Sequence, residues 1–145
     1  MKVVLQRVSE ACVSVEGREV GRIGKGYLLL LAVGKGDTKE EADQLLAKIS
    51  KLRIFADENG KSNLSISDVR GEVLVISQFT LYADCRKGNR PSFTEAASPE
   101  LAAELYEYFT ESARSHFSKV ACGVFGAYMQ VSLLNDGPFT LVLEA

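Results

Sequence analysis

The segment Tyr27-Leu28-Leu29-Leu30-Leu31-Ala32-Val33 is an unbroken apolar run in a chain of 145 residues. Gly24-Lys25-Gly26 precedes the run, and Gly34-Lys35-Gly36-Asp37 follows it. An apolar run between turn residues is typical of a strand covered on both faces, so we expect it to lie at the centre of the core. The second glycine-rich segment lacks the full GxxxxGKS/T spacing, so we interpret it as a plain turn and not as a phosphate-binding loop.

Further strands are expected on both sides of this run. Apolar and polar residues alternate over residues 3–15, and Glu16-Gly17-Arg18 then has the composition of a hairpin turn. Other strands are predicted at residues 18–23, 72–81, 119–125, 129–134 and 139–143.

Two amphipathic helices complete the predicted elements. Thr38-Lys39-Glu40-Glu41 is a capping box, and apolar residues then recur with helical spacing over residues 39–53. Ser98-Pro99-Glu100 supplies an N-cap, a proline and an acid for a second helix that ends near His116. His116 continues the apolar stripe of that helix, so we interpret this single histidine as packed or capping and not as catalytic.

The order of these elements predicts the fold class. Strands outnumber helices, and short turns join the early strands. We therefore expect an α+β fold with a mainly antiparallel, barrel-like sheet and two packed helices. The length is that of one ordinary domain, so we assign residues 1–145 to a single domain. Any larger active cleft would have to come from oligomerisation.

The composition is that of a soluble globular protein, with 46% hydrophobic and 25% charged residues. No stretch approaches the roughly 20 apolar residues of a membrane span, and the start lacks the pattern of a secretory signal. We therefore expect a cytoplasmic protein without a membrane partner. A net charge of −2 argues against an extensive surface for duplex nucleic acid, so we expect no DNA partner.

The metal-ligating side chains are few and scattered. Cys12, Cys85 and Cys122 show neither CxxC spacing nor an even number, and one histidine cannot supply a multi-histidine site. We interpret the cysteines as small apolar residues, and we expect neither a metal nor another cofactor.

Two segments break the local rules. In Ser77-Gln78-Phe79-Thr80, an apolar strand offers two hydroxyls and an amide at its carboxyl end. These side chains alternate between the faces of a regular strand, so they cannot all line one pocket unless the strand bends. Their backbone N–H groups could serve instead, and an ordinary strand end remains the alternative.

In Asn135-Asp136-Gly137-Pro138, the composition favours a turn, and general frequencies favour a trans bond before the proline.

Several motifs together resemble those of the D-aminoacyl-tRNA deacylases. The first three are Ser77-Gln78-Phe79-Thr80-Leu81, Lys87-Gly88-Asn89-Arg90-Pro91-Ser92-Phe93 and Asn135-Asp136-Gly137-Pro138. The opening residues 1–8 and the segment Phe125-Gly126-Ala127-Tyr128-Met129 are also similar to that family. Each motif alone is a weak signal, but five in order along the whole chain make the resemblance specific.

This resemblance implies an enzyme that hydrolyses the ester between a D-amino acid and the terminal adenosine of tRNA. It also implies a homodimer with its active site at the subunit interface. The catalytic residues would be Ser77, Gln78, Phe79 and Thr80, with backbone N–H groups of the last two stabilising the oxyanion. The ribose 2′-hydroxyl of the substrate would assist, so Thr80 is assigned to positioning.

The resemblance also assigns a role in chirality to Gly137 and Pro138. They would form a cis pair inserted into the pocket of the partner subunit, where an L side chain would collide with them. Glycine has no side chain to exclude, so glycyl esters, such as glycine mischarged on tRNA(Ala), are expected substrates as well.

Substrate contacts are expected from two further groups. Arg86, Lys87 and Arg90 would bind phosphates of the tRNA acceptor end, although a solvated loop is the alternative. Phe125 and Met129 would wall the pocket, although a core role is equally consistent with their sequence.

Two other functions fit parts of the sequence. A non-catalytic RNA-binding protein would use the basic loop and release nothing. A small-molecule esterase would use Ser77 or Thr80 as a true nucleophile, although no neighbouring base is evident in the sequence.

Overall fold

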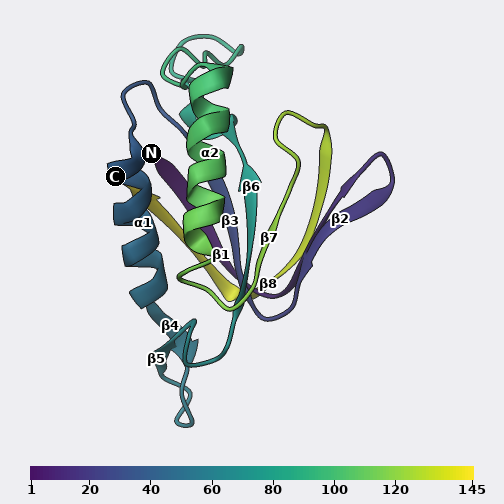
Figure 1. The fold of residues 1–145 in the computed structure, drawn as a ribbon, viewed down its shortest axis with the longest axis vertical. Helices are drawn as coiled ribbons and strands as arrows, with labels where there is room; N and C mark the ends of the chain where they lie inside the picture. Colours follow the sequence, from purple (N-terminus) through teal and green to yellow (C-terminus); the bar gives the residue numbers. More distant parts are fainter.

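Strand β1 (Lys2–Val15) organises the main sheet, because it pairs with three other strands (Figure 1). Its first half pairs with β3 (Gly26–Ala32) and its second half with β2 (Arg18–Ile23), both antiparallel. Its opposite edge pairs along almost its whole length with β8 (Met129–Glu144), also antiparallel. The computed structural model describes all 145 residues.

Two parallel pairs extend the sheet beyond β3. Strand β6 (Glu72–Ser77) pairs with β3, and β7 (Val120–Cys122) pairs with β6. Parallel neighbours require a crossover connection, and here the helices lie in those connections. The crossovers contain α1 (Lys39–Lys51), a hairpin of β4 (Arg53–Ala56) and β5 (Ser62–Ser65), a 3-10 turn η1 (Phe79–Tyr82), and α2 (Pro99–Ala113).

Both faces of β3 are buried, as its apolar sequence predicts. Tyr27, Leu29 and Leu31 belong to a cluster of 21 buried residues that includes the apolar faces of α1 and α2. Leu28 lies on the other face, in a cluster of 7 buried residues from β1, β2, β3 and β6. The helices therefore cover one face, and the sheet curls around the second cluster (Figure 1). The predicted α+β class with a barrel-like sheet and two helices is confirmed.

The helix starts follow the sequence, but the helix ends differ from the prediction. Glu41 accepts a hydrogen bond from the Thr38 N–H at 2.6 Å, which completes the capping box of α1. Helix α1 ends at Lys51, because Arg53 already begins β4. Neither helix is both long and apolar enough to cross a membrane.

The interpretation of His116 as a packed residue is wrong, although its backbone N–H bonds to the Ala113 carbonyl oxygen at the end of α2, at 2.9 Å. Helix α2 ends at Ala113, and His116 is exposed beyond it. Phe117 instead continues the apolar face and is buried. The reason is that the chain leaves the helical path after Ala113, so helical spacing no longer decides which side chain points inward.

The tail forms one long strand and not two strands joined by a turn. Val8 pairs with Asn135 and Gln6 pairs with Thr140, so residues 136–139 of β8 face Arg7 alone. They form a wide bulge in a continuous strand, which we call the β8 bulge. The Gly137-Pro138 bond within it is cis, as the family resemblance implies and contrary to the general expectation of a trans bond.

Candidate active site

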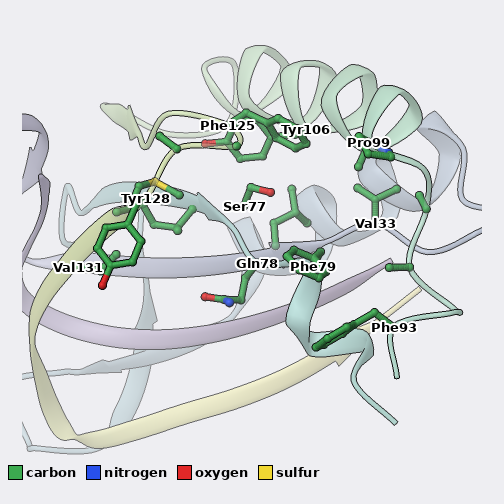
Figure 2. A pocket seen from close by; sticks show the side chains of 18 residues that line it. Val33, Ser77, Gln78, Phe79, Phe93, Pro99, Tyr106, Phe125, Tyr128 and Val131 are labelled. Atoms are coloured by element: carbon green, nitrogen blue, oxygen red, sulfur yellow. The ribbon is translucent and has the colours of Figure 1, made fainter. Parts of the chain in front are cut away.

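A cavity of about 600 Å³ lies where β6 ends beneath the first half of α2 (Figure 2). Its wall includes Ser77, Gln78 and Phe79 on one side and Tyr106 and Phe125 on the other. No charged side chain lines it. The cavity therefore suits uncharged groups with large flat surfaces, and its walls offer no carboxylate or imidazole as a general base.

The chain bends sharply at the end of β6. The Gln78 N–H donates to the Leu31 carbonyl oxygen at 2.7 Å, which is the last bond to β3. Gln78 then has φ −143° and ψ 68°, and the chain enters η1 instead of continuing the strand to residue 81. Because of this bend, Ser77, Gln78 and Phe79 all contribute to the cavity wall.

Thr80 lies just outside the cavity wall. Its hydroxyl oxygen accepts a hydrogen bond from the side-chain amide of Gln78. The structure therefore brings the four predicted residues together, but it joins the Thr80 hydroxyl to an amide and not to a base.

Two backbone donors stand free at this bend. The first bond of η1 is donated by the Leu81 N–H to the Gln78 carbonyl oxygen at 3.1 Å, so the N–H groups of Phe79 and Thr80 precede it. The first N–H groups of a helical turn have no partner within the turn, and the turn and loop hydrogen bonds of the chain include none from these two. The bend thus presents two adjacent unpaired N–H groups, an arrangement that can stabilise an oxyanion.

The opposite wall is largely apolar. Phe125 and Met129 both line the cavity, where the sequence analysis placed them. The Tyr106 hydroxyl donates to the Val75 carbonyl oxygen at 2.8 Å, and its ring lies 5.8 Å from that of Phe125. Burial raises the pKa of Tyr106 well above its usual value, so its phenol stays neutral and engaged. Sequence reasoning missed Tyr106, since it reads as one more apolar position of α2.

The basic residues form a closed loop next to the cavity. Asp84 and Ser92 exchange two backbone hydrogen bonds, of 2.7 and 3.0 Å, which close the chain between them into the basic loop. Within it, Arg86 pairs with Asp84 at 2.6 Å, and this guanidinium holds the pKa of Asp84 well below its usual range. Lys87 and Arg90 are exposed, and neither takes part in an ion pair. The two therefore carry the uncompensated positive charge of the loop.

Gly137 and Pro138 do not reach the cavity of their own chain. Both are exposed, and neither lines the cavity that contains Ser77 and Phe79. The structure therefore separates this motif from the other predicted site residues within one subunit.

Arg7 holds the β8 bulge in place from β1. Its Nε donates to the Asp136 carbonyl oxygen at 3.0 Å, its Nη1 donates to the Ile54 carbonyl oxygen, and its guanidinium lies 4.9 Å from the Phe139 ring centre. Gly137 has φ +129°, and a Cβ at this position would lie 2.8 Å from Arg7 Nη2. Only glycine fits this position without strain.

Polar side chains brace the bulge from the strand side. Asn135 accepts a hydrogen bond from the Phe139 N–H at 3.0 Å and donates to Thr140 Oγ1 at 3.0 Å. Sequence reasoning did not single out Arg7, because its partners lie far away along the chain.

Comparison with known proteins covers the whole chain. The family model described as D-Tyr-tRNA(Tyr) deacylase matches residues 4–144. The D-aminoacyl-tRNA deacylase of Thermosipho africanus is 57% identical over 145 residues, covering 100% of this chain and 97% of the relative. The enzyme of the same name from Chloroflexus aurantiacus is 57% identical, covering 100% of this chain and 91% of the relative.

Solved structures share the fold. A c-Myc DNA unwinding element binding protein superimposes with a TM-score of 0.94 at 42% identity, covering 100% of this chain and 99% of that chain. A probable eukaryotic D-amino acid tRNA deacylase superimposes with a TM-score of 0.88, covering 99% of this chain and 98% of that chain. The second pair is only 18% identical, so it shows the similarity of fold alone.

Proposed function

The chain belongs to the D-Tyr-tRNA(Tyr) deacylase family and hydrolyses the ester bond of D-aminoacyl-tRNA, and we propose that backbone donors at the bend after β6 carry the catalysis. The observation behind this proposal is the pair of unpaired N–H groups at Phe79 and Thr80 beside the cavity. An aminoacyl ester is already reactive, so the enzyme has to hold the carbonyl, admit water and stabilise the oxyanion.

The side chains at the bend then position the substrate and do not attack it. A serine or threonine nucleophile needs a neighbouring base, and the cavity wall contains none. Thr80 Oγ1 instead accepts from the Gln78 amide, which fixes both side chains next to the N–H pair. The ribose 2′-hydroxyl of the substrate assists the attacking water. This argument favours the deacylase over a small-molecule esterase with a covalent intermediate.

A second subunit supplies the chiral filter. Gly137 and Pro138 are exposed and do not line the cavity of their own chain, so they are available to the cavity of another copy. Exposed apolar side chains flank the bulge along β8, among them Leu134 at 59% and Val142 at 67%, which suits an interface between subunits. The active site therefore lies at the interface of a homodimer.

Stereochemistry follows from this arrangement. Backbone atoms of the partner's bulge occupy the side of the substrate where an L side chain would point, whereas a D side chain points away. Glycyl-tRNA, which has no side chain, is also hydrolysed.

The tRNA lies across the neighbouring loop. Lys87 and Arg90 contact phosphates of the acceptor end, together with Arg86, whose charge is partly offset by Asp84. Phe125 and Met129 wall the space for the terminal adenosine or the aminoacyl group. The reaction takes place in the cytoplasm and needs no metal.

Release of free amino acid tests this proposal. Purified protein is incubated with D-tyrosyl-tRNA, glycyl-tRNA and L-tyrosyl-tRNA, and the free amino acid is measured over time. We expect rapid release from the first two and none above background from the third. Equal rates with the D and L esters would refute the chiral filter, and a covalent acyl-enzyme trapped at Ser77 or Thr80 would refute backbone catalysis.

A further inference from the structure

Two phenylalanine side chains at the mouth of the cavity are unusually exposed. Phe79 is 54% exposed and Phe93 is 37% exposed, although both line the cavity. Their rings pack edge to face with centroids 5.1 Å apart (Figure 2). Packing against each other therefore leaves a large part of each ring free.

This pair lies at the neck between the cavity and the basic loop. Phe79 begins η1, which leads the chain toward Asp84. Phe93 directly follows Ser92, whose backbone is paired with that of Asp84. Phe93 is also three residues from Arg90, which is at most about 10 Å of extended chain. The pair thus joins the cavity wall to the base of the basic loop.

We propose that Phe93, supported edge-on by Phe79, is the stacking surface for the base next to the terminal adenosine of the tRNA. The proposal rests on the proposed function, since it assumes that the terminal adenosine occupies the cavity. Proteins commonly bind single-stranded RNA by combining cationic side chains for the phosphates with aromatic rings for the bases. Here Lys87 and Arg90 supply the first element and Phe93 supplies the second.

The chemistry of the two rings also predicts that the contact does not depend on the identity of the base. Neither ring offers a hydrogen-bond donor or acceptor, so stacking on it cannot distinguish one base from another. Phe93 therefore contributes affinity and register for the 3′ end of any tRNA, whereas it makes no contact with the scissile ester.

A comparison of two substrates isolates this contact. D-Tyrosyl-tRNA contains the neighbouring nucleotide, and D-tyrosyl-adenosine lacks it. We expect Phe93→Ala to raise KM for the tRNA substrate by about 5- to 150-fold, the range for losing one stacked base, with kcat unchanged. The same variant should raise KM for D-tyrosyl-adenosine far less, because that substrate meets Phe93 only as part of the cavity wall, and Phe93→Trp should retain the wild-type KM for the tRNA substrate.

Val124 offers a matched control, since it is another exposed apolar side chain, at 45%, and does not line the cavity. We expect Val124→Ala to change neither KM. The salt dependence separates stacking from charge, because Phe93→Ala leaves the slope of binding against salt intact whereas Lys87→Ala lowers it.

Three results would overturn the inference. An equal rise in KM for both substrates in Phe93→Ala would mean that Phe93 acts only as a wall of the cavity and not as a stacking surface. A change of oligomeric state in sedimentation would make it an interface residue, and an unchanged KM with tRNA would remove the contact altogether. Failure of the proposed function is distinct from these, since the wild-type protein would then hydrolyse neither D-tyrosyl ester.

Discussion

Arg7 on the first strand donates through Nε to the carbonyl oxygen of Asp136 at 3.0 Å, a contact across 129 residues of chain. The same guanidinium also bonds the Ile54 carbonyl oxygen, so it joins β1, the start of β4 and the β8 bulge at one point. The shape of the bulge therefore depends on a side chain held from two directions. This arrangement leads to the first prediction.

Gly137→Ala should reduce both stability and stereoselectivity. The new Cβ would lie 2.8 Å from Arg7 Nη2, and a residue with a side chain is strained at φ +129°. Left-handed strain of this kind costs about 1–3 kcal/mol. We expect the free energy of unfolding, measured in urea, to fall by that amount, and the ratio of D-tyrosyl-tRNA to L-tyrosyl-tRNA hydrolysis to fall with it.

Gly24→Ala is the control for this variant. A Cβ at Gly24 would meet nothing within 4 Å, and its φ is not in the left-handed region. Its stability and selectivity should match the wild type, and an equal loss in both variants would contradict the role of the bulge.

Removal of the Phe79 backbone N–H should lower kcat more than removal of the Thr80 hydroxyl. Phe79→Pro deletes one N–H at the first position of η1, where proline is tolerated, and Phe79→Ala deletes the same ring but keeps the N–H. We expect kcat of the proline variant to be lower than that of the alanine variant by a factor of about 10²–10³. Single-turnover hydrolysis of D-tyrosyl-tRNA measures this difference.

Thr80→Ala completes that comparison. It removes the acceptor of the Gln78 amide but keeps the Thr80 N–H, so kcat should fall far less than in Phe79→Pro. A larger loss in Thr80→Ala than in Phe79→Pro would indicate that the hydroxyl itself reacts.

Removing the positive charges of the basic loop one at a time should change the salt dependence of tRNA binding by different amounts. Lys87 and Arg90 have no acidic partner, whereas Arg86 is paired with Asp84 at 2.6 Å. Replacing Lys87 or Arg90 with alanine should lower the slope of log Kobs against log salt by about 0.7 for each lost phosphate contact. Arg86→Ala should change it less, as measured by filter binding to uncharged tRNA. Equal slopes in all three variants would show that the pairing with Asp84 is irrelevant to binding.

One buried and one half-buried tyrosine should make the protein sensitive to alkali. Burial raises the pKa of Tyr82 to about 12 and that of Tyr27 well above its usual value of 10. Above pH 10 the unfolded chain therefore releases these protons while the folded chain retains them. The unfolded state then binds fewer protons, so stability falls as pH rises, by up to about 1.4 kcal/mol per pH unit for the buried Tyr27 and by less for the half-buried Tyr82, which solvent screens. Below pH 9 these groups contribute no slope.

Tyr27→Phe tests this directly. The Tyr27 hydroxyl is buried without a hydrogen-bond partner, so its removal should leave stability at pH 7 unchanged or slightly higher. Urea unfolding between pH 8 and pH 11 should show a shallower decline than in the wild type. A loss of stability at pH 7 would mean that the hydroxyl makes a bond to water or to Arg7.

Short-range patterns predicted much of the fold. The apolar run at residues 27–33 and the capping box at Thr38 depend on neighbouring residues alone, and the structure has both features. The parallel pairing of β6 with β3 and the single long β8 depend on partners that are distant in the sequence. No local signal distinguishes such pairings from hairpins, so the tail was wrongly predicted as two strands with a turn.

In the candidate site, too, local features could be predicted from the sequence, whereas features that depend on distant residues could not. Ser77 to Thr80 stood out because polar residues interrupt an apolar strand, but the alternation of side chains could not reveal the bend at Gln78. Tyr106 gave no signal of a site, and Phe93 stood out only as the last residue of a family motif, because an exposed ring and a buried ring look alike in a sequence. The separation of Gly137 from the cavity required knowledge of the register between β1 and β8.

The pairing of β1 with β8 also has a consequence for how the protein is made. The two strands lie at opposite ends of the sequence, yet they form the longest ladder of the sheet. Contacts of such high sequence separation form slowly, and β8 follows all the other strands of the sheet along the chain. The β8 bulge therefore takes its shape only once β1 and β8 have paired, so the proposed chiral filter depends on one of the slowest contacts of the fold to form.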